Sequence, residues 1–586
     1  MKSNKNIFTA LLISLLAFTS FSCSDYLDYD EDKVWTDELV WTEYTNVEKY
    51  LAAIYDKTPS TFAYVGGAFL AASTDDAEHA NLSSDVERYN TGALSEFSHP
   101  NSGWSKNYDG IRLASKFIEN ADTLTLYKNK WNDNYNTQLE YLYRWRGEAR
   151  FLKAYFYFEL IKRYGGVPIV EKWVNEYLPA DATRKPFNEV VEYIALTCDS
   201  AMKYLPVKSE FKNSDMGHAT KGAALALKTR AFLYAASELN NPTGAYHAYY
   251  DSCAVNAARL FNMGYSVSGV NYNDLFTPGS GVHFKNNDVI FDKRAAASNS
   301  LEKSNYPVGF NQGSGHTNPT QDLVDAFEMA DGTPFDWDNS THAAAPYENR
   351  DPRFYATILH NGAQMDVGNV EMARKVETFN GGLDGPVQEF TIGTRTGYYL
   401  KKYIHTNLDF VQGNMKQHYW FLFRYAEVLL NYAEAMNELH NDPDVDPSGY
   451  GMTAREAVNM VRSRVNMPAV VAANADEFRT KLRNERRVEL AFEDHRHWDV
   501  RRWNVGVEFL NSPVHGVDIE RQLIPRDEDN DGVQDVDEDG NLLWDEEFSY
   551  EVKKVEERVF EEHMNLYPIP RSEVYSGVEL PQNPGW

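Results

Sequence analysis

The chain has 586 residues and a mass of 67.0 kDa, enough for one large domain or several small ones. Hydrophobic residues make up 43% and charged residues 24%, as in ordinary globular proteins, so wholesale disorder is excluded. The formal net charge of -29 argues against nucleic acid and anionic lipid as partners, because an acidic surface repels phosphate groups. Aromatic residues reach 14%, and a surplus of Tyr and Trp is typical of surfaces that stack against ligands.

The N-terminus has the pattern of an export signal. Lys2 and Lys5 precede an apolar run over residues 7–18, which is too short to span a bilayer. Small residues then lead to Cys23, as in a bacterial lipoprotein signal, so we expect cleavage before Cys23 and its acylation. Ser20 stands where such signals usually carry Leu, and an ordinary secretory signal is the alternative.

The pattern divides the chain into three parts. Residues 1–22 are the expected signal peptide, 23–35 an acidic tether, and 36–586 a single domain. Within that domain, the predicted helical segments are 36–265 and 416–503, and the loop-rich segments are 266–415 and 504–586. Loops of this length in a compact protein usually carry function.

Amphipathic periods predict the helices. The clearest covers residues 141–164, which Gly165 and Gly166 end, and Trp104 belongs to a similar pattern and is assigned to the core. Further helices are predicted over residues 42–55, 104–120, 188–204, 221–239, 246–263, 421–439, 454–464 and 475–494, and near 322–329. Helices of similar length joined by short turns predict a mainly α fold: tetratricopeptide-like helical pairs with long inserted loops and short strands.

Two cysteines follow Cys23. Cys198 and Cys253 both lie in helical patterns, so we expect buried thiols, with a disulfide in an oxidising compartment as the alternative.

The charged run over residues 483–494 looks catalytic at first sight, because paired carboxylates perform general acid–base chemistry. However, arginines are interleaved with the acids, and Glu485 and Glu489 share one helix face, where one neighbouring arginine can contact both. We therefore expect a structural charge network. The same interpretation covers Arg424 with Glu427, and Arg350 and Asp351 with Arg353. The sequence contains no HExxH, Walker, GxSxG or CxxC motif, and His495 and His497 are poorly spaced for shared metal ligation on a helix.

Residues 527–538 match the calcium-loop pattern D-x-D-x-D-G-x5-E. Alternating carboxylates place oxygens on one side of a tight turn, an arrangement that suits Ca2+. The predicted ligands are Asp527, Asp529, Asp531, Val533, Asp535 and Glu538. A second register beginning at Asp535 overlaps the first, and the flanks are not the helices of an EF-hand. We expect a calcium-ordered surface loop, with a solvated acidic loop as the alternative.

Six segments together carry a resemblance to a known family. They are EARFLKAYFYFEL at 148–160 with YGGVP at 164–168, ATKGAALALKTR at 219–230, NPTQDLVDAFE at 318–328 with NRDPRF at 349–354, RYAEVLLNYAEA at 424–435, RNERRVELAFE at 483–493 with RRW at 501–503, and YPIP at 567–570 with QNPG at 582–585. In this order they resemble the SusD/RagB family of starch-utilisation-type outer-membrane lipoproteins.

The resemblance implies a binding protein rather than an enzyme. Members are lipid-anchored to the outer membrane, face the cell exterior, capture chiefly oligosaccharides, and act as the lid of a SusC-like TonB-dependent transporter. The acidic stretch after Cys23 resembles the export tag of such surface lipoproteins. Ca2+ is the only cofactor expected, in a structural role.

The family does not mark its ligand residues by motif, so candidates follow from chemistry. Sugars stack on aromatic faces, while Asn, Asp, Glu and Arg bond their hydroxyls. The candidates are Asp75, Asp76, Glu78, Arg88, Tyr89, Tyr306, Phe310, Asn311, Trp337 and Tyr347. For each aromatic residue, local core packing is the alternative. Alternatives for the whole protein are a peptide-binding lid, a surface glycoside hydrolase, and a helical scaffold without a small ligand.

Overall fold

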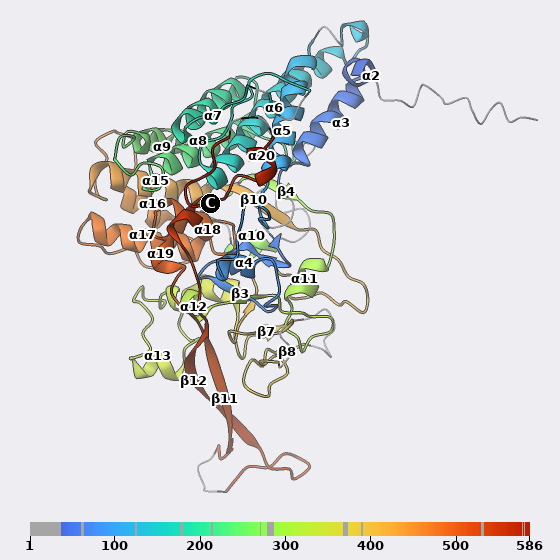
Figure 1. The fold of residues 1–586 in the computed structure, drawn as a ribbon. Helices are drawn as coiled ribbons and strands as arrows, with labels where there is room; N and C mark the ends of the chain where they lie inside the picture. Colours follow the sequence, from blue (N-terminus) through green and yellow to red (C-terminus); the bar gives the residue numbers. More distant parts are fainter. Residues whose placement is uncertain are drawn as a thin grey trace, which may run out of the picture.

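The computed structural model has a helical layer and a loop layer, with a β-hairpin that projects from the loop layer (Figure 1). It describes residues 37–59, 64–123, 126–175, 178–179, 181–212, 215–269, 271–277, 286–366, 373–387, 391–528, 533–576, 578 and 580–586. The predicted signal peptide, Cys23 and the acidic tether lie outside the described residues. The architecture confirms the predicted mainly α fold with long inserted loops.

The helical layer is a stack in which each helix packs against the next along the chain as far as α16, whereas α17 packs against α15. After α2 (Asp37–Thr42), its helices are α3 (Tyr44–Tyr55), α5 (Trp104–Asn120), α6 (Tyr135–Tyr164), α7 (Phe187–Met202), α8 (Lys221–Ala236), α9 (Tyr249–Ala258), α15 (Tyr425–His440), α16 (Ala454–Ser463) and α17 (Ala475–Glu489). The loop layer separates α9 from α15 in sequence, yet these two helices pack together. The stack is therefore continuous across the long insertion.

Local chemistry explains where these helices begin and how closely they pack. The Thr220 side chain caps α8 by accepting from the Ala223 N–H at 3.3 Å, and Thr453 and Glu456 form a capping box on α16. Helix α8 is buried on nearly every side. A Cβ on Gly222 would lie 2.1 Å from the Tyr265 hydroxyl, so α8 needs glycine at this point of close approach.

The loop layer is held by short elements that join distant segments. Its two-residue to six-residue strands pair antiparallel as β1 (Tyr64–Val65) with β2 (Ala68–Phe69), β3 (Ala77–His79) with β5 (Thr317–Pro319), β4 (Val289–Arg294) with β10 (Tyr419–Arg424), β6 (Ile358–Leu359) with β9 (Tyr399–Leu400), and β7 (Gln364–Met365) with β8 (Arg374–Lys375). Its short helices include α4 (Glu87–Asn90), α11 (Ser300–Asn305), α12 (Gln321–Ala326), α14 (Pro352–Thr357), α18 (Arg496–Arg502) and α20 (Arg571–Val574).

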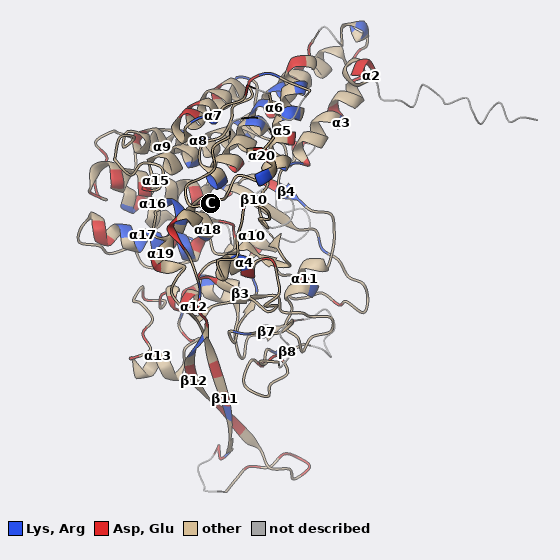
Figure 2. Ribbon diagram, in the orientation of Figure 1, with Lys and Arg blue, Asp and Glu red and all other residues tan. Residues whose placement is uncertain are grey.

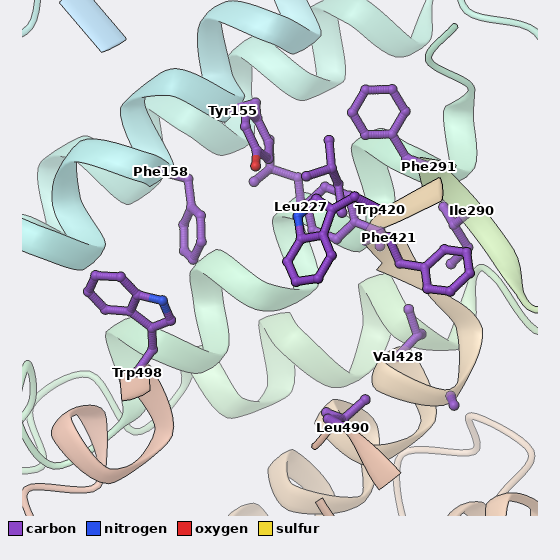
Figure 3. Close-up of a cluster of buried hydrophobic side chains, with 14 of the residues drawn as sticks. Tyr155, Phe158, Leu227, Ile290, Phe291, Trp420, Phe421, Val428, Leu490 and Trp498 are labelled. Carbon is purple, nitrogen blue, oxygen red and sulfur yellow. The ribbon is translucent and has the colours of Figure 1, made fainter. Parts of the chain in front are cut away.

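An aromatic core joins the two layers. Figure 3 shows Tyr155 and Phe158 of α6 near Trp420 and Phe421 of β10, with Trp498 of α18 on the other side of Phe158. All of these side chains are buried. Much of the aromatic surplus is therefore internal, and Trp104 is fully buried as predicted.

Several predicted helices differ in their bounds from the structure, and helix α6 begins at Tyr135, six residues before the predicted start at residue 141. The helix expected from residue 421 begins at Tyr425, because the apolar run before it forms strand β10; such a run fits a buried strand or a helix equally well. Helix α17 ends at Glu489 rather than at residue 494, and Phe492 and Asp494 then adopt positive φ angles of 61° and 63°. Helix α9 is also shorter than predicted.

The prediction of only short strands after residue 504 is wrong. Strands β11 (Val514–Pro525) and β12 (Trp544–Glu556) pair over their whole length as one hairpin. From Glu520 to its end, β11 is exposed on nearly every residue, so the strand has no alternation of apolar and polar residues by which to recognise it.

Cys198 and Cys253 are free and buried, as predicted, and burial raises the pKa of both thiols. Among the described residues, no helix combines the length and apolar character needed to cross a bilayer.

Candidate functional site

Two predicted ligand carboxylates are buried in ion pairs. Asp75 lies 2.6 Å from Arg496 and 3.0 Å from Arg487, and Asp76 lies 2.7 Å from Arg487. Although burial opposes it, the guanidinium groups of Arg487 and Arg496 hold the pKa of Asp75 well below its ordinary value. These pairs attach the loop at residues 75–76 to the end of α17 and the start of α18; they engage both oxygens of Asp75 and one oxygen of Asp76.

Glu78 belongs to a second buried group, which we call the Glu78 cluster: Glu78, Glu87, Glu556, Arg395 and Arg558. Glu78 lies 2.7 Å from Arg558 and 2.9 Å from Arg395, and Glu556 lies 3.6 Å from Arg558. Burial, and then the charge of Glu78, raise the pKa of Glu87 to about 7. Burial and the charges of Glu78 and Glu87 raise the pKa of Glu556 to about 8. The cluster connects the base of the hairpin to β3 and α4.

Four of the predicted aromatic contacts form the interior of the loop layer: Tyr89, Tyr306, Phe310 and Tyr347. The Tyr306 hydroxyl donates to the backbone carbonyl of His405, and the Tyr347 hydroxyl lies 3.3 Å from that of Tyr398. In this conformation the four rings belong to the core of the loop layer, in agreement with the alternative of local core packing.

The other three candidates reach the surface in different ways. Trp337 is half-buried, and its Nε1 donates to Asp325 at 3.2 Å. Asn311 is exposed. Arg88 is half-buried and donates to the Ser98 side chain at 2.9 Å and to its carbonyl at 2.6 Å.

These hydrogen bonds connect Arg88 to the turn that contains Ser98. Next to this turn lies an exposed aromatic surface that the sequence analysis did not predict. Phe97 is 72% exposed and Tyr575 is 70% exposed. The Arg571 guanidinium lies 4.4 Å from the centre of the Phe97 ring and 4.9 Å from that of Tyr575. We call Phe97, Arg571 and Tyr575 the aromatic platform. Cation–π contacts with the same arginine therefore position both exposed rings.

Polar groups border the aromatic platform. Glu96 accepts from Arg571 at 3.0 Å and from Gln582 at 3.3 Å, and the Arg571 backbone N–H donates to the Glu96 carbonyl. The platform therefore combines open ring faces with a carboxylate, an amide and a guanidinium. Ring faces that contact sugar C–H groups, with polar groups for the hydroxyls, are the requirements of carbohydrate binding.

The predicted charge network is confirmed and lies between the layers. We call it the α17 network; its members are Asp288, Asp351, Glu485, Glu489, Glu493, Arg353, Arg424, Arg462, Arg464 and Lys402. Arg424 lies 2.6 Å from both Glu489 and Glu493. Figure 2 shows blue and red segments interleaved around α17 and α18. All of the network's side chains are at least nine-tenths buried, so they join elements rather than face a substrate.

One predicted pairing within this region is wrong. Arg424 does not pair with Glu427, which instead contacts Arg230 of α8 at 2.6 Å. Asp351 does pair with Arg353, at 2.7 Å, whereas the Arg350 guanidinium donates to backbone carbonyls, including that of Phe327 at 2.7 Å.

The predicted calcium loop lies at the end of the hairpin. Asp529 and Asp531 are outside the described residues, whereas Asp527, Val533, Asp535 and Glu538 are within them. The Asp535 carboxylate accepts from the Glu528 N–H at 2.9 Å. The strands β11 and β12 flank the loop, in agreement with the expectation that EF-hand helices are absent.

Two protein-family models match this chain. A family model described as the SusD family matches residues 287–586, and one described as starch-binding associating with outer membrane matches residues 25–233. The chain belongs to the SusD family. The resemblance predicted from the six segments is therefore confirmed.

Individual relatives extend this match over nearly the whole chain. SusD-like protein P38 of Formosa agariphila is 26% identical over 549 residues, covering 90% of this chain and 96% of that protein. A crystal structure of a SusD-like protein from Bacteroides fragilis covers 95% of this chain and 99% of its own, with 27% identity and a TM-score of 0.74. A SusD-like carbohydrate-binding protein from the same species, at 23% identity and a TM-score of 0.69 over 92% of this chain and 100% of its own, shares the fold.

Proposed function

We propose that this SusD-family protein binds oligosaccharides outside the cell and delivers them to a SusC-like TonB-dependent transporter, for which it acts as the lid. The aromatic platform carries this proposal, because Phe97 and Tyr575 expose large ring faces beside Glu96, Gln582 and Arg571. The family description and the carbohydrate-binding relative support the same ligand class.

The proposed location is the outer membrane, with the chain anchored through acylated Cys23 and facing the exterior. The family description of outer-membrane association supports it. Intact-mass analysis of the N-terminal peptide from membranes tests the anchor, and a mature N-terminus without fatty acid contradicts it. Cross-linking in cells tests the transporter, which must be recovered with the chain if the chain acts as its lid.

The proposed activity is binding without catalysis. The carboxylates of the α17 network and of Asp75 and Asp76 are buried against arginines, an environment that supports ion pairing rather than proton transfer to a sugar. Incubation with oligosaccharides followed by product analysis tests this point. Release of shorter sugars would establish a glycoside hydrolase instead.

The decisive binding experiment titrates the purified chain with defined oligosaccharides and, as the alternative ligand class, with peptides. For an oligosaccharide that binds, we expect Phe97→Ala and Tyr575→Ala each to weaken affinity by about tenfold, the effect of losing one stacking contact of roughly 1.4 kcal/mol. Tyr143→Ala is the matched control, because Tyr143 is an exposed tyrosine of α6 in the helical layer. Binding of peptides alone would overturn the ligand class, and equal losses in all three variants would overturn the site.

We also propose that the end of the hairpin binds Ca2+ through the residues predicted from the sequence. The proposal rests on the D-x-D-x-D-G-x5-E pattern of residues 527–538, in a loop where the predicted ligand Glu538 is exposed. The role of the ion is to order this loop.

A further inference from the structure

One buried cluster in the loop layer, apart from the aromatic platform, has the composition of a transition-metal site. It contains Glu302 of α11, His405 from the segment after β9, and His418 directly before β10. One possible ligand atom from each residue, a ring nitrogen or a carboxylate oxygen, lies within 4.8 Å of the other two. All three side chains are buried.

The hydrogen bonds within this cluster leave two ligand atoms unused. Glu302 Oε1 accepts from His418 Nε2 at 2.8 Å and from the His405 backbone N–H at 3.2 Å. In contrast, Glu302 Oε2 and His405 Nε2 are buried without a hydrogen-bond partner, and His405 is only 7% exposed. Buried polar atoms nearly always have a hydrogen-bond partner. Two buried atoms without one in the same cluster therefore indicate that a bound partner is missing.

The charge of Glu302 points to a cation as that partner. Within the described part of the chain, its only ion pair is with His418, and no Lys or Arg reaches its carboxylate. The equally buried Glu489 contacts three guanidinium groups. A buried carboxylate is unfavourable unless a positive charge compensates it.

We propose that Glu302, His405 and His418 bind Zn2+. Two imidazoles and one carboxylate form an established ligand set for this ion, with bonds of about 2.0–2.2 Å. Ligand atoms around a tetrahedral ion lie roughly 3.4 Å apart, so the side chains need only a small approach from their present positions. Nitrogen ligands disfavour Ca2+ and Mg2+, which take oxygen ligands.

The surroundings provide access and rigidity. His405 lines a cavity of about 350 Å³ together with Lys401, Thr406 and Asn407, so the cavity extends to the residue that carries one of the three proposed ligands. The Tyr306 hydroxyl, bound to the His405 carbonyl, also accepts from the Leu408 N–H at 3.2 Å and so holds the segment that carries His405. The bound ion would join α11 to the segments on either side of residues 406–417.

Calorimetric titration of the full, chelator-treated chain with ZnCl2 tests the proposal, with Ca2+ present in excess to occupy oxygen-only sites. We expect about one Zn2+ per chain, and replacement by Co2+ should give the visible absorption bands of a low-symmetry site with nitrogen ligands. A wild-type chain that binds no Zn2+ in this experiment overturns the proposal without recourse to any variant.

Variants then locate the site. His405→Ala and His418→Ala should each weaken Zn2+ binding by at least about 100-fold and abolish the Co2+ bands, because each removes a direct ligand. His247→Ala, which removes an exposed histidine near the end of α15, is the matched control and should bind as the wild type does. Folded variants, checked by circular dichroism, that retain wild-type affinity place the ion elsewhere and contradict the assignment.

Discussion

The α17 network and the Glu78 cluster both pair buried glutamates with arginines, yet the pKa of Glu489 in the first and that of Glu87 in the second are shifted in opposite directions. In the α17 network, Arg464, Arg424 and Arg353 outweigh the effect of burial and hold the pKa of Glu489 well below its ordinary value. The Glu78 cluster contains three carboxylates but only two arginines, and Glu87 has no ion pair among the described residues. Burial therefore prevails there and raises the pKa of Glu87 to about 7.

The difference shows that the ratio of guanidinium groups to carboxylates decides which protonation state a buried acid adopts. In the α17 network, Glu489 stays ionised at any pH above its lowered pKa, so its ion pairs join the two layers over that range. In the Glu78 cluster, no third arginine compensates the carboxylates, and Glu87 and Glu556 take up protons at pH values near neutrality. We therefore expect the attachment of the hairpin to β3 and α4 to depend on pH in this range.

The largest effect should follow from removing one cation of the α17 network. Arg424→Met leaves Glu489, Glu493 and Asp288 with less compensation, so we expect the free energy of unfolding to fall by about 3–5 kcal/mol. Urea denaturation measures this change. Arg455→Met is the control, because its partner Asp444 is largely exposed, and its loss should stay below about 1 kcal/mol. Equal losses in the two variants would contradict the compensation argument.

A moderate effect of the opposite sign is expected at Glu87. Because its folded-state pKa is raised to about 7, the stability that protonation contributes is present below the unfolded value of 4.5 and is lost as pH rises through about 7. Glu87→Gln keeps an oxygen for the Asn90 side chain and removes the charge. At pH 8 it should raise the free energy of unfolding by about 1–3 kcal/mol, and at pH 4 it should change little.

Urea denaturation of wild type and variant across this pH range checks the sign. Glu489→Gln provides the comparison, because it should destabilise the chain at pH 8, where the ionised carboxylate is needed by three arginines. A stabilising Glu489→Gln would show that the two clusters do not differ as described.

The smallest effect on stability is expected at the hairpin end, where acidic residues such as Asp537, Glu538 and Asp539 are exposed. Asp535→Asn should change the free energy of unfolding by less than about 0.5 kcal/mol in the absence of Ca2+. The same substitution should weaken Ca2+ binding by on the order of tenfold, because it removes one charged ligand. Calorimetry with CaCl2 measures the affinity, and a wild-type chain that binds no Ca2+ at millimolar concentration contradicts the proposed loop site.

Sequence patterns predicted the helices well where one face is apolar and a stop follows. Helix α5 has the predicted bounds, 104–120, and α8 begins at the predicted residue. The hairpin was missed as a long element, because its outer half buries neither face and hydrophobic alternation is absent there. It is held by backbone pairing and by side-chain contacts such as the ion pair between Arg521 and Glu546, which do not produce a hydrophobic alternation in the sequence.

Spacing along a helix also predicted that Glu485 and Glu489 would share arginines, but it did not predict which ones. Glu427 lies three residues from Arg424, yet Arg424 ends strand β10 and contacts α17, while Glu427 of α15 contacts Arg230 of α8. The partner depends on which element packs alongside, and that is a property of the tertiary structure.

The candidate site was the least predictable part. The loop layer needs a core of its own, and Tyr306 and Tyr347 provide it, although the composition of their loops also suits a ligand surface. Arg571 of the aromatic platform and Glu96 at its border are separated by 475 residues and meet only in the folded chain. The one local signal was Phe97, an isolated aromatic residue between Glu96 and Ser98 in a polar stretch without helical periodicity.

The hairpin also sets a length scale for this molecule. The exposed part of β11, from Glu520 to Pro525, extends roughly 20 Å at about 3.3 Å per residue. Electrostatic fields at physiological ionic strength decay over about 8 Å, so the acidic end of this arm is independent of the charges on the body. The hairpin projects from the loop layer (Figure 1). A broad surface that approaches from this side therefore meets the acidic end of the hairpin before it reaches the rest of the protein.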